Sequence, residues 1–469
     1  MTATSVLLGA LATSVAFVVV AIVLTSKTGA SKHLFPSLVV YSVTALSIAS
    51  SVVSPRLTST STTDVLANPA GDAAAKVATI GAIAIFVIAV MLAIVRKIPM
   101  AMSPIAWSLI SYGAVGFFSS LANAQPWELG MTYTYLLVAG VGIGATWTFA
   151  EALPVIRRCL RAYIWSSLAL MIISPSLAFW DVQGRELFGF KQLAGVTTHP
   201  NGLGTVAAVA IFVELLRATG RRRFIPLNLV ATVVVLLLTQ SRGAWLAAVI
   251  GAFFWIIGRA KNSSVRLAAP LVVAAIIASI AFQDVILGAL EETTNQRDFS
   301  TLNGRTDIWT QSLVPLWGSP LIGRGALVFD TRFRWDALGL NIDAGHSNAH
   351  NQIIQTLIER GFLGLVILAV LLWLMFRAAW RQPISYRGPI LAMLMVYVSR
   401  FAVETPLYFS SASLNTAMML LIVTLLTANH GPTGPEPPGH QRELSLGRPP
   451  RLVQTLSRQP SRAAGSQRL

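Results

Sequence analysis

Charge is scarce in this 469-residue chain, and negative charge is the scarcer kind. Charged residues make up only 12% of the sequence, with 19 Asp and Glu against 35 Lys and Arg. A soluble domain of ordinary composition carries about twice that share of charge. Hydrophobic residues make up 54%, and several runs of about 20 residues are almost uncharged. The composition therefore excludes a soluble globular domain and predicts an all-α protein, a polytopic membrane helical bundle.

Cysteine is almost absent as well. Cys159 is the one cysteine in the sequence, so no internal disulfide can form. No basic segment precedes the first apolar run, which Lys27 follows, and we expect an anchor helix rather than a cleaved signal peptide. We find no internal repeat, so the inverted-repeat pattern of many transporters is not evident.

The apolar runs predict about 13 transmembrane helices. They lie at about 5–25, 34–54, 77–95, 103–121, 132–150, 163–179, 202–217, 224–239, 243–258, 267–283, 352–376, 388–402 and 409–427.

Basic residues fall in every second loop between these spans, which is the orientation signal of an inner (plasma) membrane protein rather than a nucleic-acid-binding pattern. The positive-inside rule then places the N-terminus outside and the C-terminus in the cytoplasm. It also makes 284–351 one large extracytoplasmic loop inside a membrane domain that covers 1–427.

The tail, 428–469, is rich in proline and arginine and is expected to be a disordered cytoplasmic segment. Such a tail either is simply solvated or binds anionic lipid or a protein partner.

A histidine and two glycines mark the start of the span predicted at 352–376. Eleven residues at about 100° each return to within roughly 20° of the starting direction, so His350 and Gly361 are expected to share one helical stripe, with Gly364 close by. The stripe would carry the polar side chain of His350, with Asn351 beside it. About 16 Å deeper, the stripe would have a glycine surface against which a lipid chain or another helix could lie. Alternatively, His350 is a hydrogen-bonded surface residue and Asn351 satisfies local backbone groups.

Arg242 lies in a turn of a few residues between two apolar runs, on the predicted outer side. Because the positive-inside rule disfavours arginine there, it is a candidate functional residue. The alternative is an arginine that reaches out to lipid headgroups.

Arg305 begins a run, 305–317, that is expected to form a short helix on the membrane interface. Its apolar side would carry Ile308, Trp309, Leu313 and Trp317. Guanidinium groups bind phosphate oxygens in a bidentate manner, and helix starts add amide donors. A surface pair with Asp307, or a cap, is the alternative.

Three further residues are candidates for substrate binding. His199 and Asn201 directly precede a predicted span, where Asn201 would alternatively serve as a helix N-cap. His346 stands four residues before His350, and Asp343 is near, but no zinc signature accompanies them and we expect no metal. Glycoside hydrolysis by two carboxylates is a further alternative, but the spacing of the carboxylates in the loop singles out no pair. These carboxylates are Glu291, Glu292, Asp298 and Asp307.

The sequence from about 195 to 405 resembles the superfamily of O-antigen ligases and polymerases, which are bacterial envelope glycosyltransferases. The family pattern of histidine, a small polar residue, nine residues, glycine, two residues and glycine is met by His350, Asn351, Gly361 and Gly364.

Two arginine patterns add to the resemblance. The family pattern of arginine, three residues and leucine is met by Arg242 and Leu246. The family pattern of an arginine ahead of Ile-Trp is met by Arg305. Because family members are usually described with twelve spans and a cytoplasmic N-terminus, the odd span here is expected to be an additional leading helix.

The resemblance implies an enzyme that transfers or polymerises glycan on the extracytoplasmic face. The donor would be a polyprenyl-diphosphate-linked glycan, and the acceptor a hydroxyl on a glycan, lipid or protein. No cofactor or obligatory metal is implied, and a single displacement would invert the anomeric centre. Arg242 and Arg305 would neutralise the diphosphate, and His350 would take the acceptor proton or align the reactants. The alternative is a transporter or flippase of lipid-linked glycans.

Overall fold

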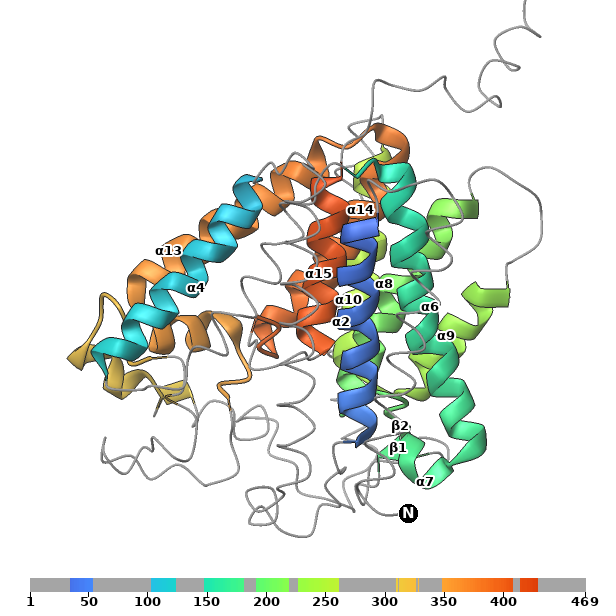
Figure 1. Ribbon diagram of the computed structural model, residues 1–469, viewed down its shortest axis with the longest axis horizontal. Coiled ribbons are helices and arrows are strands. Elements are labelled where there is room, and N and C mark those ends of the chain that lie inside the picture. Colours follow the sequence, from blue (N-terminus) through green and yellow to red (C-terminus); the bar gives the residue numbers. More distant parts are fainter. Residues whose placement is uncertain are drawn as a thin grey trace, which may run out of the picture. The chain divides into compact units, whose positions relative to one another are not determined.

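The computed structural model describes ten stretches of the chain (Figure 1). They are residues 34–53, 103–123, 147–180, 191–218, 227–260, 309–310, 312–325, 328, 348–407 and 414–428. Within these stretches, three helices are long and apolar enough to cross a membrane: α4 (Pro104–Ala122), α10 (Arg242–Arg259) and α13 (Gln352–Trp380).

Apart from α6, the other helices match predicted spans by position. These other helices are α2 (Leu34–Val53), α6 (Phe149–Ile173), α8 (Pro200–Ala218), α9 (Leu227–Leu238), α14 (Ile384–Ser399) and α15 (Leu414–Thr427). The spans predicted at 5–25, 77–95 and 267–283, most of that at 132–150, most of the loop 284–351 and nearly all of the tail lie outside the described residues. The count of 13 therefore stays a prediction.

Helix α6 corrects one predicted boundary. The arginine-rich stretch between the spans predicted at 132–150 and 163–179 is not a loop but the first half of α6. A capping box formed by Thr148 and Glu151 starts this helix. Within it, the guanidinium of Arg161 binds both carboxylate oxygens of Glu214 on α8 at 2.6 and 2.8 Å. Because this ion pair neutralises the arginine, the basic residue is accommodated inside the bundle.

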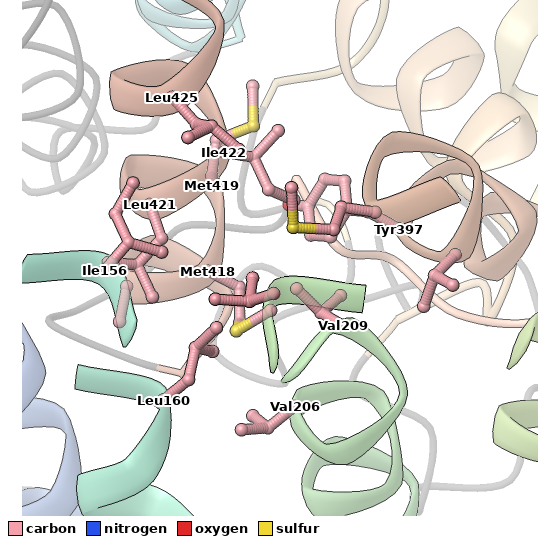
Figure 2. Close-up of a cluster of buried hydrophobic side chains, with 14 of the residues drawn as sticks. Ile156, Leu160, Val206, Val209, Tyr397, Met418, Met419, Leu421, Ile422 and Leu425 are labelled. Carbon is pink, nitrogen blue, oxygen red and sulfur yellow. The ribbon is translucent and has the colours of Figure 1, made fainter. Parts of the chain in front are cut away.

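The apolar core lies where α15 packs among α6, α8 and α14 (Figure 2). Met418 and Met419 of α15 lie with Leu160 of α6 and Val206 of α8, and all four side chains are buried. The other labelled members are Ile156, Val209, Tyr397, Leu421, Ile422 and Leu425. Most of α15 is buried, as expected for a helix that is apolar on every face.

Helices α10 and α14 pack antiparallel and very closely. A Cβ added to Gly258, near the end of α10, would stand only 2.6 Å from the Cα of Gly388, near the start of α14. At the opposite end, the start of α10 meets the residues that follow α14, because a Cβ on Gly243 would lie 3.9 Å from Val403. The end of the bundle at which α8, α10 and α13 begin and α14 ends is called the site end below.

The region around the site end also contains a feature that the all-α prediction omitted. After the short helix α7 (Pro175–Ala178), the strands β1 (Phe179–Trp180) and β2 (Gln192–Leu193) form a two-stranded antiparallel sheet. This small sheet leads directly into α8.

Helix α13 is broken at Gly361, which overturns the predicted continuous stripe. Gly361 has φ 63° and ψ −164°. This conformation lies outside the helical region, and its positive φ favours glycine. His350 precedes the helix rather than lying on it, since Asn351 is the N-cap. The prediction that His350 and Gly361 share one helical stripe is therefore wrong. After the break, 362–380 is about 28 Å long, enough to cross the apolar layer alone.

The break is filled by a loop rather than by a lipid chain or a helix. Residues 320–325, which follow the 3-10 helix η3 (Val314–Gly318), form four backbone hydrogen bonds across it. The amides of Arg324 and Gly325 donate to carbonyls ahead of the break at 2.7 and 3.1 Å, and the carbonyls of Pro320 and Leu321 accept from amides after it at 2.9 and 3.0 Å. The loop thus satisfies the backbone groups that the break sets free.

A buried polar layer joins the first part of α13 to α4, which lies beside it (Figure 1). Glu359 and Arg360, each 1% exposed, form an ion pair, and the Arg360 guanidinium lies 4.4 Å from the centre of the Tyr112 ring. Gly364 packs against the Arg360 side chain. The two glycines of the predicted stripe thus contact protein groups.

Candidate active site

His350 has an unusual backbone conformation at the site end. Its φ is 47°, and Gln240 (φ 49°) is the one other non-glycine residue with positive φ among the described residues. Such left-handed residues are uncommon and gather at functional sites, because the surrounding structure must hold them. Asn351 performs the capping role that was one of its predicted alternatives, since its Oδ1 accepts the amide hydrogens of Ile353 and Ile354 at 2.9 and 3.1 Å.

The imidazole of His350 faces a carboxylate, that of Glu404. His350 Nδ1 lies 3.7 Å from Glu404 Oε2. Glu404 lies in the turn that follows the 3-10 helix η6 (Arg400–Ala402). The other oxygen of Glu404 accepts a 2.8 Å hydrogen bond from the side-chain amide of Asn201 and lies 3.5 Å from the Arg400 guanidinium. Glu404 therefore joins two predicted site residues, one from the start of α8 and one from the start of α13.

Asn201 connects this carboxylate to α10. Its Oδ1 accepts a 2.8 Å hydrogen bond from the hydroxyl of Ser241, and its backbone carbonyl accepts a 2.5 Å hydrogen bond from Arg400. The prediction of Asn201 as an N-cap is wrong, because α8 begins at Pro200 and the Asn201 side chain is engaged by Glu404 and Ser241 instead.

His199 supports the same end of α8. Its Nδ1 accepts the amide hydrogen of Asn201 at 3.1 Å, and its ring contacts the Trp180 ring at 4.8 Å between centroids. The sheet residue Trp180 thus holds His199 in place. His199 is a neighbour of the Glu404 cluster through Asn201.

The Glu404 carboxyl stays ionised over an unusually wide pH range. Burial alone raises the pKa of this group, but its pairing with His350 and the positive charge of Arg400 act the other way. Together with the Asn201 hydrogen bond they lower the pKa of Glu404 from 4.5 to about 2. At neutral pH, His350 therefore faces a permanent negative charge.

Arg242 is the first residue of α10 and lies beside this cluster. The preceding residue, Ser241, is the N-cap: its Oγ accepts the amide hydrogen of Ala244 at 3.3 Å and donates to Asn201. The next residue, Gly243, lies close to Val403, which precedes Glu404. The Arg242 side chain is exposed. The structure thus brings Arg242 to the site end together with His350.

The motif of the predicted extracytoplasmic loop is attached to the same place through its tryptophan. The indole Nε1 of Trp309 donates a 2.8 Å hydrogen bond to the carbonyl of Ala349, the residue before His350. Arg305, four residues before Trp309, and His346, four before His350, lie outside the described residues. The contact supports the predicted nearness of the Arg305 motif to His350 at the level of the backbone.

Sequence reasoning missed Arg400 and Glu404. Between Arg387 and the tail these are the only charged residues, and they stand four apart in an otherwise apolar stretch. Ionisable residues in such a stretch are candidates for function by default. That signal was available from the sequence.

The other chemical hypotheses fall mainly outside the described residues. Within the described part of the chain no group of three histidine, cysteine or acidic residues could hold a metal ion. Asp343, His346 and the carboxylates weighed for glycoside hydrolysis are not among these residues.

Comparison with known proteins identifies a family match inside this chain. Residues 227–369 match the family described as O-antigen ligase. This part of the chain is therefore O-antigen ligase-like. The matched range contains Arg242, Trp309, His350 and the Gly361 break of this O-antigen ligase-like chain. Together with the apolar helices, this family match indicates a membrane-embedded protein.

One curated relative is similar to this O-antigen ligase-like chain over a short region. It is the exopolysaccharide production protein ExoQ of Rhizobium meliloti, 32% identical over 95 residues, which cover 19% of this chain. The chain spans about a fifth (20%) of the length of that relative.

Proposed function

We propose that this protein is an integral-membrane glycosyltransferase that transfers or polymerises glycan from a polyprenyl-diphosphate-linked donor onto a hydroxyl acceptor on the extracytoplasmic face. The observation that carries the proposal is the pairing of His350 with Glu404 at the same end of the bundle as Arg242. The match of residues 227–369 to the O-antigen ligase family supports the same class of reaction.

The proposed role of His350 is that of general base. Glu404 lies at Nδ1 and holds the imidazole in one orientation, and Nε2 is the proposed acceptor of the proton of the acceptor hydroxyl. A permanent carboxylate also stabilises the imidazolium that this transfer creates.

The bond changes follow from a single displacement. The acceptor oxygen bonds to the anomeric carbon as the bond from that carbon to the diphosphate oxygen breaks, and the hydroxyl proton passes to His350. The electron pair leaves with the diphosphate, whose added charge Arg242 and Arg305 would stabilise. The product glycosidic bond would have inverted configuration.

The test is a transfer assay in vesicles that contain the purified protein, a polyprenyl-diphosphate-linked oligosaccharide and an acceptor glycan. We expect the wild-type chain to release one polyprenyl diphosphate for each new glycosidic bond. The variants His350→Ala, Arg242→Ala and Arg305→Ala should insert normally and lose transfer by about 100-fold or more. Near-normal transfer by all three variants would refute the proposal. Movement of intact donor across the vesicle without release of diphosphate would identify a flippase instead.

A further inference from the structure

Two glutamines on the first turn of α13 hold the two loops that carry His350 and Glu404. Gln352 and Gln355 are three residues apart and therefore lie on one face of the helix. Both side chains are almost fully buried, at 1% and 0% exposed. Each side chain binds a backbone amide close to one of the two site residues: Gln355 near His350, and Gln352 near Glu404.

Gln355 binds the loop of His350. Its Oε1 accepts the amide hydrogen of Ala349 at 2.7 Å, and its Nε2 donates to the carboxylate of Glu359. The carbonyl of the same Ala349 residue accepts from Trp309. The backbone of Ala349 is therefore held at both its polar groups, directly before the left-handed residue His350.

Gln352 binds the loop of Glu404. Its Oε1 accepts the amide hydrogen of Leu407 at 2.8 Å, and its Nε2 lies 3.2 Å from both the Tyr112 and Thr356 hydroxyls. Since Tyr112 belongs to α4 and Thr356 to the next turn of α13, the glutamine is fixed from its far side by two helices. Leu407 follows Glu404 by three residues.

We infer that Gln352 and Gln355 are positioning residues that set the separation between the His350 imidazole and the Glu404 carboxylate. The inference deepens the proposed function and rests on it. The two loops are far apart in sequence, and a rigid helical turn between them provides a common reference for both. Each amide oxygen meets a backbone N–H in a dry environment, where an unpaired donor is costly. Loss of either glutamine therefore releases one loop rather than leaving it in place.

The experiment compares Gln352→Met and Gln355→Met, which keep an unbranched side chain but lose both hydrogen-bonding groups. Gln382→Met is the matched control, because Gln382 is also a buried glutamine and lies just after the opposite end of α13. We expect each of the first two variants to lower kcat for glycan transfer about tenfold or more while KM for the lipid-linked donor stays within about twofold. The control should change neither. Because both glutamines set one distance, the double variant should lose less than the product of the two effects.

A second readout does not depend on the proposed function. The rate at which diethyl pyrocarbonate modifies His350, measured by peptide mass spectrometry, should rise about threefold or more when the imidazole is no longer held against Glu404. The other histidines of the same chain serve as internal references, and Glu404→Gln shows the rate for an unpaired imidazole.

The outcomes separate the two ideas. Unchanged kcat and unchanged modification in both glutamine variants would overturn the positioning role, as would a raised KM with unchanged kcat. If the wild-type chain transfers no glycan, the proposed function fails and the modification rates alone decide the positioning role. If the methionine variants do not accumulate in the membrane, Gln352→Asn and Gln355→Asn keep the amide but shorten its reach, and the same criteria apply.

Discussion

Replacing Glu404 by glutamine removes one charge from the site and little else. A glutamine has nearly the same shape and still offers an oxygen to the Asn201 amide, which now bonds the carboxylate at 2.8 Å. Besides the 3.5 Å contact with the Arg400 guanidinium, what disappears is the attraction between the carboxylate and a protonated His350 at 3.7 Å. At an effective dielectric constant of about 20 this attraction amounts to roughly 4 kcal/mol.

The expected effect on activity is smaller than this, because both side chains are partly exposed, 31% for His350 and 22% for Glu404. With solvent screening we expect a loss of about 2–3 kcal/mol of transition-state stabilisation, which is roughly a 30- to 150-fold decrease in kcat/KM. Most of it should appear in kcat, because the imidazolium forms only during the reaction.

The assay is glycan transfer in vesicles at saturating and limiting donor, with Glu214→Gln as the control. Glu214 is also a carboxylate that contacts an arginine, but it is buried and its partner is Arg161 on α6. The control is expected to lower thermal stability and to leave kcat of the inserted protein unchanged. A kcat/KM within about twofold of wild type for Glu404→Gln would refute the reasoning, since it would show that the carboxylate does not act on His350.

Other outcomes follow from single features. Gly361→Ala should destabilise the protein by about 2–4 kcal/mol in thermal unfolding, because φ is 63° and the new Cβ would overlap the Leu321 carbonyl. As a control, Gly243→Ala should change the stability by less than about 0.5 kcal/mol. Arg161→Met should cost about 3–5 kcal/mol, since it leaves the Glu214 carboxylate buried and unpaired, and a smaller loss in denaturant titration would contradict this. The lowered pKa of Glu404 contributes about 3 kcal/mol of stability that is fully present above pH 4.5 and is lost as pH falls towards 2. Glu404→Gln should therefore flatten the pH dependence of the melting temperature within that window.

Much of the helical framework could be predicted from the sequence, because long apolar runs and start signals are local properties. The run that begins after Ser241 gave α10 to within a residue, and Ser103 with Pro104 marks the start of α4. The loop predicted at the arginines of 157–161 was wrong, because a basic cluster indicates a loop unless a partner on another helix neutralises it. Glu214 is such a partner and is distant in sequence.

The site was predicted in part for the same reason. His350, Arg242, His199 and Asn201 stand at ends of apolar runs, and the structure gathers them at one end of the bundle. Glu404 was missed because its significance lies in contacts with residues far away in the sequence. The break of α13 was missed because a glycine inside an apolar run is common in transmembrane helices and gives no sign of its φ.

The docked loop at Gly361 has a consequence for how this protein is assembled and how its sequence can vary. The four hydrogen bonds across the gap use main-chain atoms on both sides, so they depend on chain length and not on which side chains 320–322 carry. Substitutions on the outward surface of this segment, such as at the 65% exposed Leu321, are therefore tolerated, whereas inserting or deleting one residue shifts every bond out of register. In addition, residues 352–360 obtain their final geometry only when the segment 320–325 has docked against them. The first turns of α13, next to His350, thus depend on a segment that precedes them in the chain and folds onto them from outside the helix.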